Sequence, residues 1–186
     1  MGARAVLLAL MTAAAPAPGP AGAVPPADPL AGVVLGDLSG RTWRLDELHD
    51  SPVLVVVADR KAAAQARAWG ARLAAMEAPL APWRAPGKVA WVSVADLRRV
   101  PDYARGSARE RLREREEARG EGERRLASPL LLDWEGTLAA RLEAAQGEAR
   151  LVLLAPDRRV LVALAGAPSD DAVARLRDAL AALVAG

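Results

Sequence analysis

From Val33 onwards, apolar residues recur along this chain with the spacing of strands and helices. The run from Pro52 to Ala58 (PVLVVVA) is apolar without a break and rich in valine, which is typical of a strand buried on both faces of a sheet. The next apolar positions have the spacing of one helix face; they are Ala62, Ala66, Trp69, Leu73 and Met76. The pattern therefore predicts a central strand followed by an amphipathic helix, which Pro79 closes.

Two hairpins are expected, one near each end of the patterned region. Segments 33–35 and 41–45 flank the turn signal Asp37–Gly40, and a short helical turn over 45–49 follows. Segments 151–154 and 160–164 meet at the turn Pro156–Arg158. A last helix begins at Ser169, whose hydroxyl can cap it. The apolar face of that helix consists of Val173, Leu176, Leu180 and Leu183.

Two more strands, over 88–94 and 129–133, lie between the hairpins. A second helix face follows the later strand; it consists of Leu138, Leu142 and Ala145 and ends at Gly147. No internal repeat interrupts the order hairpin, β-α-β-α-β-α, β-β-α. A single sheet with helices on both faces accommodates every segment, so the sequence predicts one α/β domain.

Residues 105–125 alternate arginine with glutamate. Ser107 and Glu110 form a capping box that predicts the start of a helix, and Gly120 with Gly122 predicts its end. A helix of mixed charge without aromatic residues is poorly suited to binding nucleic acid. We interpret the segment as a mostly solvated helix; the alternative is a surface for a partner or an anionic membrane.

The first 23 residues have the pattern of a secretory signal peptide. Arg4 gives a positive start, residues 5–15 are apolar, and Ala21-Gly22-Ala23 is a cleavage site before Val24. The apolar run is too short to span a bilayer, and no cysteine follows it for lipid attachment. We expect a signal peptide over 1–23, a linker over 24–32 and one domain over 33–186. The mature protein is then periplasmic or secreted without a transmembrane anchor; an uncleaved anchor or a disordered tail is the alternative.

The chain contains no cysteine and one histidine, and its formal net charge is +2. Chemistry that needs a thiolate is therefore excluded, as is a zinc site of the usual kind. The small net charge does not indicate binding to nucleic acid or to a membrane. His49, beside Asp50, is interpreted as a surface residue; counting alone does not exclude a Ser-His-Asp arrangement, but no G-x-S-x-G motif is present. No metal and no cofactor are expected.

Four stretches of the chain are similar to segments of one family. GDLSGRTWRLDEL (36–48) is similar to an opening hairpin, and PVLVVVADRKAAAQARAW (52–69) to a central strand with its active-site helix. PLLLDWEGTLAARL (129–142) is similar to an inserted strand and helix, and LVLLAPDRRVLVALAG (151–166) to a closing hairpin. In this order and spacing they resemble the thioredoxin-like superfamily, in its peroxiredoxin and periplasmic thiol-disulfide oxidoreductase branch. The resemblance implies a three-layer α/β/α sandwich with a central mixed sheet and an N-terminal β-hairpin.

The catalytic residues of that family are missing here. An ungapped comparison places Ala62 and Gln65 at the two thiol positions, and Gly147-Glu148-Ala149-Arg150 stands where the family has a cis proline. Since the thiolate is the nucleophile in disulfide exchange and in peroxide reduction, we expect no thiol oxidoreductase or peroxidase activity. No catalytic residue of the family is carried over.

Two places are candidate binding sites. Asp59, Arg60 and Lys61 follow the central strand at the start of a helix, where free amides favour an anion or a peptide; the alternative is that Asp59 only caps the helix. Trp134 follows the strand over 129–133 and either packs over a helix or offers a stacking surface. Its neighbours Asp133 and Glu135 suggest paired carboxylates for acid–base work, although capping by Asp133 explains that residue better.

The sequence therefore predicts an exported, redox-inactive thioredoxin-like domain that binds a protein or peptide partner. The alternative is an enzyme whose chemistry is not that of a thiol or is supplied by a partner, with polar groups around Asp59, Arg60 and Asp133. A concave pocket that holds at least one carboxylate with a strongly shifted pKa would favour the enzyme.

Overall fold

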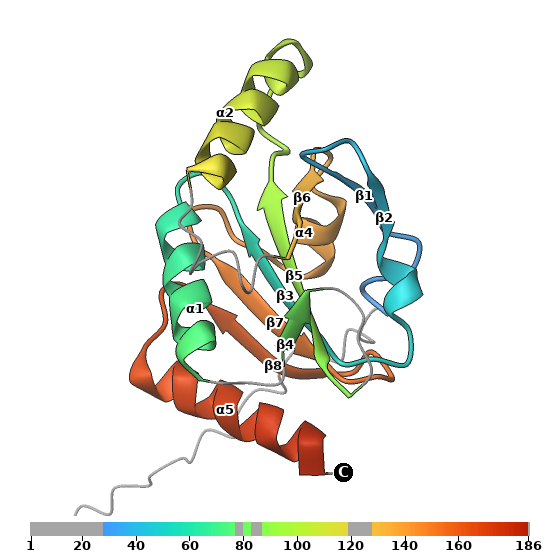
Figure 1. The fold of residues 1–186 in the computed structure, drawn as a ribbon, viewed down its shortest axis with the longest axis vertical. Coiled ribbons are helices and arrows are strands. Elements are labelled where there is room, and N and C mark those ends of the chain that lie inside the picture. The colour runs from blue at the N-terminus through green and yellow to red at the C-terminus, as the bar shows by residue number, and fades with distance from the viewer. Residues whose placement is uncertain (1–27, 77–79, 83–86, 119–127, 186) are drawn as a thin grey trace, which may run out of the picture.

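A computed structural model describes residues 28–76, 80–82, 87–118 and 128–185 of the chain (Figure 1). The strands in this part are β1 (Val34–Asp37), β2 (Thr42–Arg44), β3 (Val53–Ala58), β4 (Leu80–Pro82), β5 (Val89–Asp96), β6 (Leu130–Asp133), β7 (Arg150–Leu154) and β8 (Val160–Ala165). The helices are α1 (Ala63–Ala75), α2 (Arg105–Glu117), α4 (Thr137–Arg141) and α5 (Asp170–Ala185), with 3-10 turns η1 (Leu45–Leu48) and η2 (Asp102–Ala104).

The strands of the described residues form one mixed sheet in the order β2-β1-β6-β5-β3-β7-β8. Strand β4 pairs with the first half of β5, and β6 pairs in parallel with the second half of β5 on the same side. Strand β3 is central: it runs parallel to β5 and antiparallel to β7, and its first five residues are buried. The prediction of a strand buried on both faces over 52–58 is therefore confirmed.

Alternate residues of β3 supply two separate hydrophobic cores. Val53, Val55 and Val57 pack with the leucines of η1 and α4 on one face of the sheet. Leu54 and Val56 pack with α1 and α5 on the other face. Figure 1 shows α1 and α5 on the same side of the sheet and α4 on the opposite side. The three-layer α/β/α sandwich that the sequence predicts is the observed architecture.

The two longest amphipathic helices follow the sequence prediction. Trp69 of α1 is fully buried, and its indole N–H donates to the carbonyl of Gly166, 2.9 Å away. Helix α5 begins after Ser169, whose hydroxyl accepts a hydrogen bond from the Ala172 amide at 3.2 Å. The predicted cap at Ser169 is thus confirmed, while the predicted helix end at Pro79 lies outside the described residues.

Two predictions about the other helices are wrong. Ser107 does not cap α2, because the chain already turns at η2 and the helix begins at Arg105 without a side-chain cap. Helix α4 is shorter than predicted: Glu143 adopts a left-handed backbone (φ 54°), and Ala145 is exposed beyond the end of the helix. The Glu143 amide donates to Ala140 and the Ala144 amide to Ala139, a pairing that terminates helices. The glycines predicted to end α2, Gly120 and Gly122, lie outside the described residues.

The β1–β2 hairpin is held at its turn by the buried carboxylate of Asp37. One oxygen accepts from the amides of Ser39 and Arg41 and from the Ser39 hydroxyl, and the other accepts from the Trp43 indole at 2.8 Å. Burial raises the pKa of Asp37, but these hydrogen bonds together lower it by more, so the pKa lies below its ordinary value. The predicted hairpin is therefore present, and its turn is hydrogen-bonded to an aspartate whose ionised form is favoured.

Candidate functional site

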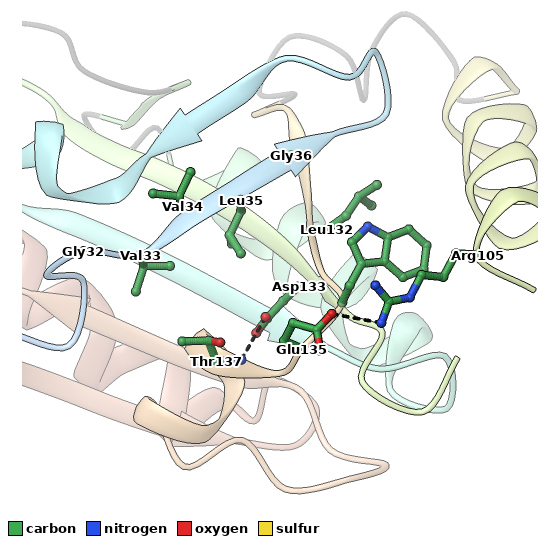
Figure 2. A pocket seen from close by; sticks show the side chains of 11 residues that line it. Gly32, Val33, Val34, Leu35, Gly36, Arg105, Leu132, Asp133, Glu135 and Thr137 are labelled. Carbon is green, nitrogen blue, oxygen red and sulfur yellow. Dashed lines mark hydrogen bonds and ion pairs between the residues drawn. The ribbon is translucent and has the colours of Figure 1, made fainter. Parts of the chain in front are cut away.

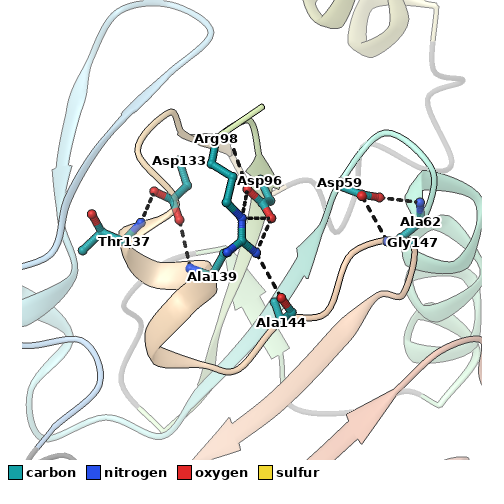
Figure 3. A network of polar contacts seen from close by, with 9 residues as sticks. All are labelled: Asp59, Ala62, Asp96, Arg98, Asp133, Thr137, Ala139, Ala144 and Gly147. Atoms are coloured by element: carbon teal, nitrogen blue, oxygen red, sulfur yellow. Dashed lines mark hydrogen bonds and ion pairs between the residues drawn. The ribbon is translucent and has the colours of Figure 1, made fainter. Parts of the chain in front are cut away.

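Three aspartates stand at or just beyond the carboxyl ends of the parallel strands β3, β5 and β6. Asp59 follows β3, Asp96 ends β5, and Asp133 ends β6 directly opposite Asp96 in the strand register. Because these strands are parallel and adjacent, the three residues lie along one edge of the sheet (Figure 3). In open α/β sheets this edge is where ligands most often bind. The hydrogen bonds and ion pairs of each aspartate therefore determine whether its carboxylate is available to a ligand.

Asp59 and Gln65 join the start of α1 to the segment before β7, and we call these two side chains with Gly147 and Ala149 the clasp. The Asp59 carboxylate accepts from the Ala62 amide at 2.9 Å and from the Gly147 amide at 3.0 Å. The Gln65 amide accepts from the Ala149 amide at 2.8 Å and donates to the Gly147 carbonyl at 3.3 Å. The clasp therefore uses the polar atoms of both side chains to fix one loop.

The sequence comparison assigns thiols to two positions, and one of them is held by Gln65 of the clasp, while Ala62 stands at the other. Ala62 is fully buried, and Gln65 is half-buried with both polar atoms bonded. The capping bond proposed for Asp59 is present, and the same carboxylate also reaches Gly147, which the sequence did not indicate. Arg60 and Lys61 are exposed beside the clasp, so their predicted contact with a ligand stays a prediction.

Asp96 binds Arg98, two residues further along the chain. The Arg98 guanidinium donates to both carboxylate oxygens and also to the carbonyl of Ala144, at 3.0 Å. This side chain lies against Gly136, where an added Cβ would stand 2.7 Å from the Arg98 Cδ. Gly136 also has a left-handed backbone, with φ 71°. The glycine thus provides the space in which Arg98 links the end of β5 to the loop after α4.

Asp133 caps α4, as the sequence suggested. Its carboxylate is 1% exposed and accepts hydrogen bonds from the amides of Thr137 and Ala139, both at 2.9 Å. Glu135, by contrast, is exposed and forms an ion pair with Arg105 at 2.9 Å. Asp133 therefore holds the start of α4, whereas Glu135 pairs with a side chain of α2. Asp59 and Asp133 both accept hydrogen bonds from main-chain amides.

Trp134 lies between the end of β6 and the first turns of α2. It is half-buried, and the Arg105 guanidinium stands over its ring, 5.5 Å from the centroid. Arg105, Gly106 and Arg109 line an open hollow with Trp134. Sequence reasoning named Trp134 but missed the two arginines. Their spacing of four residues, on the helix face that carries Leu112, was the available signal.

The other polar residues that the sequence singled out form no site in the described residues. His49 is exposed; its Nδ1 lies 3.1 Å from the Asp46 carbonyl and its Nε2 3.4 Å from Asp50. In the part of the chain that the structure covers, no group of three or more histidine, aspartate or glutamate side chains is placed to hold a metal ion. Within those same residues, no helix has the length and hydropathy needed to cross a membrane.

No protein-family model matches the chain, and no curated protein matches it. Several solved structures, in contrast, match the chain. The exposed lipoprotein thioredoxin of Streptococcus pneumoniae is 13% identical over 80% of this chain and 98% of its own, with a TM-score of 0.55. DsbF of Mycobacterium tuberculosis is 15% identical over 83% and 97%, with a TM-score of 0.54. Peroxiredoxin Q of Xanthomonas campestris is 17% identical over 84% and 92%, with a TM-score of 0.51. The fold is thioredoxin-like.

The thioredoxin-like fold confirms the resemblance drawn from the sequence, and the missing thiols separate this chain from those named redox proteins. The chain has no cysteine at any position, and the described residues contain no cis peptide bond. Since disulfide exchange proceeds through a thiolate, this thioredoxin-like chain has no group that can begin it. At the corresponding positions, Gln65 belongs to the clasp and Ala62 is buried, with its amide bonded to Asp59.

Proposed function

We propose that this protein is an exported, redox-inactive thioredoxin-like module that binds a protein or peptide partner. The observation that carries the proposal is the clasp, because Asp59 and Gln65 bind the main chain of a loop where a redox protein would need free thiols. The fold is intact around this position, with well-packed cores on both faces of the sheet. A retained scaffold without its chemistry is suited to a role that depends on surface and shape.

The N-terminal sequence supports the exported part of the proposal. Residues 1–23 have the charge, apolar run and cleavage motif of a signal peptide. Among the similar structures are an exposed lipoprotein thioredoxin and a disulfide oxidoreductase described as secreted, the latter 17% identical with a TM-score of 0.50. In a bacterial host, the full chain should therefore appear outside the cytoplasm with a mass that corresponds to a start at Val24.

The edge beside the clasp is the surface that we assign to the partner. Arg60 and Lys61 are exposed there, next to α1, and Trp134 is half-exposed further along the same edge. Each of the three aspartates is committed to the protein's own loops or to Arg98, so the groups left for a partner are basic and aromatic. Such a surface favours a peptide that carries negative charge.

Selection from a random peptide library tests the binding role. Peptides enriched on the purified protein should converge on a common sequence, and their affinity should fall in the variant R60Q/K61Q. The control variant R175Q/R177Q removes two exposed arginines from α5 and leaves the assigned edge intact, so it should bind normally. Selection that never converges would overturn the binding role, and equal losses in both variants would overturn its location.

A further inference from the structure

Arg109 carries a charge that nothing in the described residues neutralises. It is half-buried in α2, and neither a hydrogen bond nor an ion pair joins it to another described residue. Its Nε is shielded from solvent and has no acceptor. A buried donor without a partner is unfavourable, so Arg109 is poorly satisfied by the protein alone.

Arg105, one helical turn earlier, is in a different electrostatic situation. Its guanidinium pairs with Asp102 and with Glu135, both at 2.9 Å. Further along the helix, Arg113 pairs with Glu110 and donates to the carbonyl of Leu38. Arg105 and Arg113 therefore have charged partners, although the Nε of Arg105, like that of Arg109, has no acceptor. Of the two arginines that line the hollow, Arg109 is the one whose charge has no partner among the described residues.

The hollow in front of Arg109 continues into a second one, and we call the two together the β1–α2 groove. The first hollow has a volume of about 290 Å³ and is lined by Arg105, Gly106, Arg109 and Trp134. The second has a volume of about 310 Å³ and is lined by residues 32–36, by 132–135, and by Arg105 and Thr137 (Figure 2). Since Arg105 and Trp134 line both hollows, the groove is extended and open.

The floor of the groove is the place where strands β1 and β6 separate, and we call this place the fork. Strands β1 and β6 pair at Asp37 with Leu131 and at Gly36 with Leu132, and they part beyond that point. On the other side of β1, Val33 accepts from the Leu45 amide. Because hydrogen bonding alternates along an antiparallel strand, the N–H and C=O of Val34 face the fork. The Val34 side chain, which also lines the groove, is 48% exposed.

We propose that the β1–α2 groove binds an acidic segment of the partner in an extended conformation, with one carboxylate of that segment on Arg109. This inference rests on the proposed function and names the site and the chemistry of the partner. An extended peptide can bond to the Val34 main chain as an added strand does. The carboxylate of the peptide forms a charge-assisted pair with Arg109 once the guanidinium turns toward it. Trp134 then packs over the peptide residue that lies between the contact with Val34 and the contact with Arg109.

A carboxylate fits this groove better than a phosphate group because Arg105 pairs with two carboxylates of the protein, which leaves no net positive charge for a doubly charged group. Glu135 and Asp102 already neutralise Arg105 and would repel a second negative charge on the ligand. A group with one negative charge matches Arg109, the arginine of the groove whose charge has no partner among the described residues. The occupant is therefore a glutamate or aspartate side chain.

Two blocked peptides and two matched variants test the proposal. The probe is a nonapeptide that alternates Thr with Glu, and its control alternates Thr with Gln. R109Q removes the charge from the groove but keeps most of the side-chain stem, while R111Q removes one charge from an exposed position of the same helix. Both variants change the net charge equally. The glutamate peptide should bind the wild-type protein, R109Q should weaken that binding at least about tenfold, and R111Q should change it less than about twofold.

Several outcomes would overturn this site. No binding of the glutamate peptide, equal losses in R109Q and R111Q, or equal binding of the glutamine peptide would each do so. Tighter binding of a peptide with phosphothreonine in place of one glutamate would overturn the assignment to a carboxylate. If library-selected peptides bind the protein and are insensitive to R109Q, the proposed function stands and the β1–α2 groove is not its site.

Discussion

Asp59 and Gly147 are 88 residues apart in the chain, and a hydrogen bond of 3.0 Å joins the carboxylate of the first to the amide of the second. The same carboxylate holds the first turn of α1 through Ala62. One side chain thus fixes both sides of the place where a thioredoxin-like redox site would open. Its removal should therefore affect the stability of the fold as well as the local loop.

We expect the substitution D59A to lower the free energy of unfolding by about 1–3 kcal/mol, because it leaves two amides without their acceptor. D59N should cost less, since its carbonyl oxygen can still accept one of the two hydrogen bonds. Urea denaturation measures the free energy of unfolding of both variants. R60A changes the exposed neighbour and should stay within about 0.5 kcal/mol of the wild type. A D59A protein as stable as R60A would show that the clasp contributes nothing.

The purified protein should reduce neither insulin disulfides nor peroxide above the buffer rate. The reason is compositional: the chain has no thiol, and Ala62 and Gln65 stand at the corresponding positions. Insulin turbidity with dithiothreitol and peroxide consumption measure the two activities, with a cysteine-containing thioredoxin as the positive control. A rate above buffer that persists through repeated purification would contradict the assignment as redox-inactive.

The substitution G136A should destabilise the protein more than G32A does. Both glycines have left-handed backbones, with φ 71° and 65°, so backbone strain is similar. Only at Gly136 would the new Cβ meet another residue, the Arg98 side chain at 2.7 Å, whereas nothing lies within 4 Å at Gly32. We expect G136A to cost at least about 1 kcal/mol more in thermal or urea unfolding.

A double-mutant cycle locates the cause of that difference. An R98G background lacks both atoms that the new Cβ would meet closest, the Arg98 Cδ at 2.7 Å and Cβ at 2.9 Å, so G136A should then cost about as much as G32A does. If G136A costs the same in both backgrounds, the contact with Arg98 is not the reason for the glycine.

Asp37 should make the stability of the protein depend on acid pH. Its pKa is lower in the folded chain than in the unfolded chain, so its ionised form stabilises the fold at pH values above the unfolded pKa. That contribution is lost as the pH falls through the folded pKa. The difference in unfolding free energy between wild type and D37N should therefore shrink from about pH 6 to about pH 2.

Urea denaturation at a series of pH values measures this difference, with D178N as the control at an exposed position of α5. The D178N profile should run parallel to that of the wild type. A D37N profile that is also parallel would mean that the hydrogen bonds to Asp37 do not depend on its charge.

The sequence predicted those parts of the fold that rest on local periodicity. The valine run of β3, the face of α1 around Trp69 and the cap of α5 at Ser169 are each visible within a few residues. The errors came where a neighbouring turn overrides a local signal. The capping box at Ser107 fails because η2 has already started the helix, and α4 ends early because Glu143 adopts a left-handed backbone.

The site was predictable only in part, for a related reason. Capping by Asp59 and by Asp133 follows from their positions just before helices, and both bonds are present. The bond from Asp59 to Gly147 and the meeting of Arg109 with Trp134 depend on how distant segments pack. No short window of sequence contains that information.

The clasp also makes thiol chemistry costly to introduce at this place. A mutation that introduces cysteine at position 65 removes the Gln65 side chain and with it two of the hydrogen bonds that order the loop before β7. An intermediate with one new cysteine is thus weakened before any dithiol exists to be selected. The hydrogen bonds that order this loop therefore oppose the stepwise introduction of a dithiol into the scaffold.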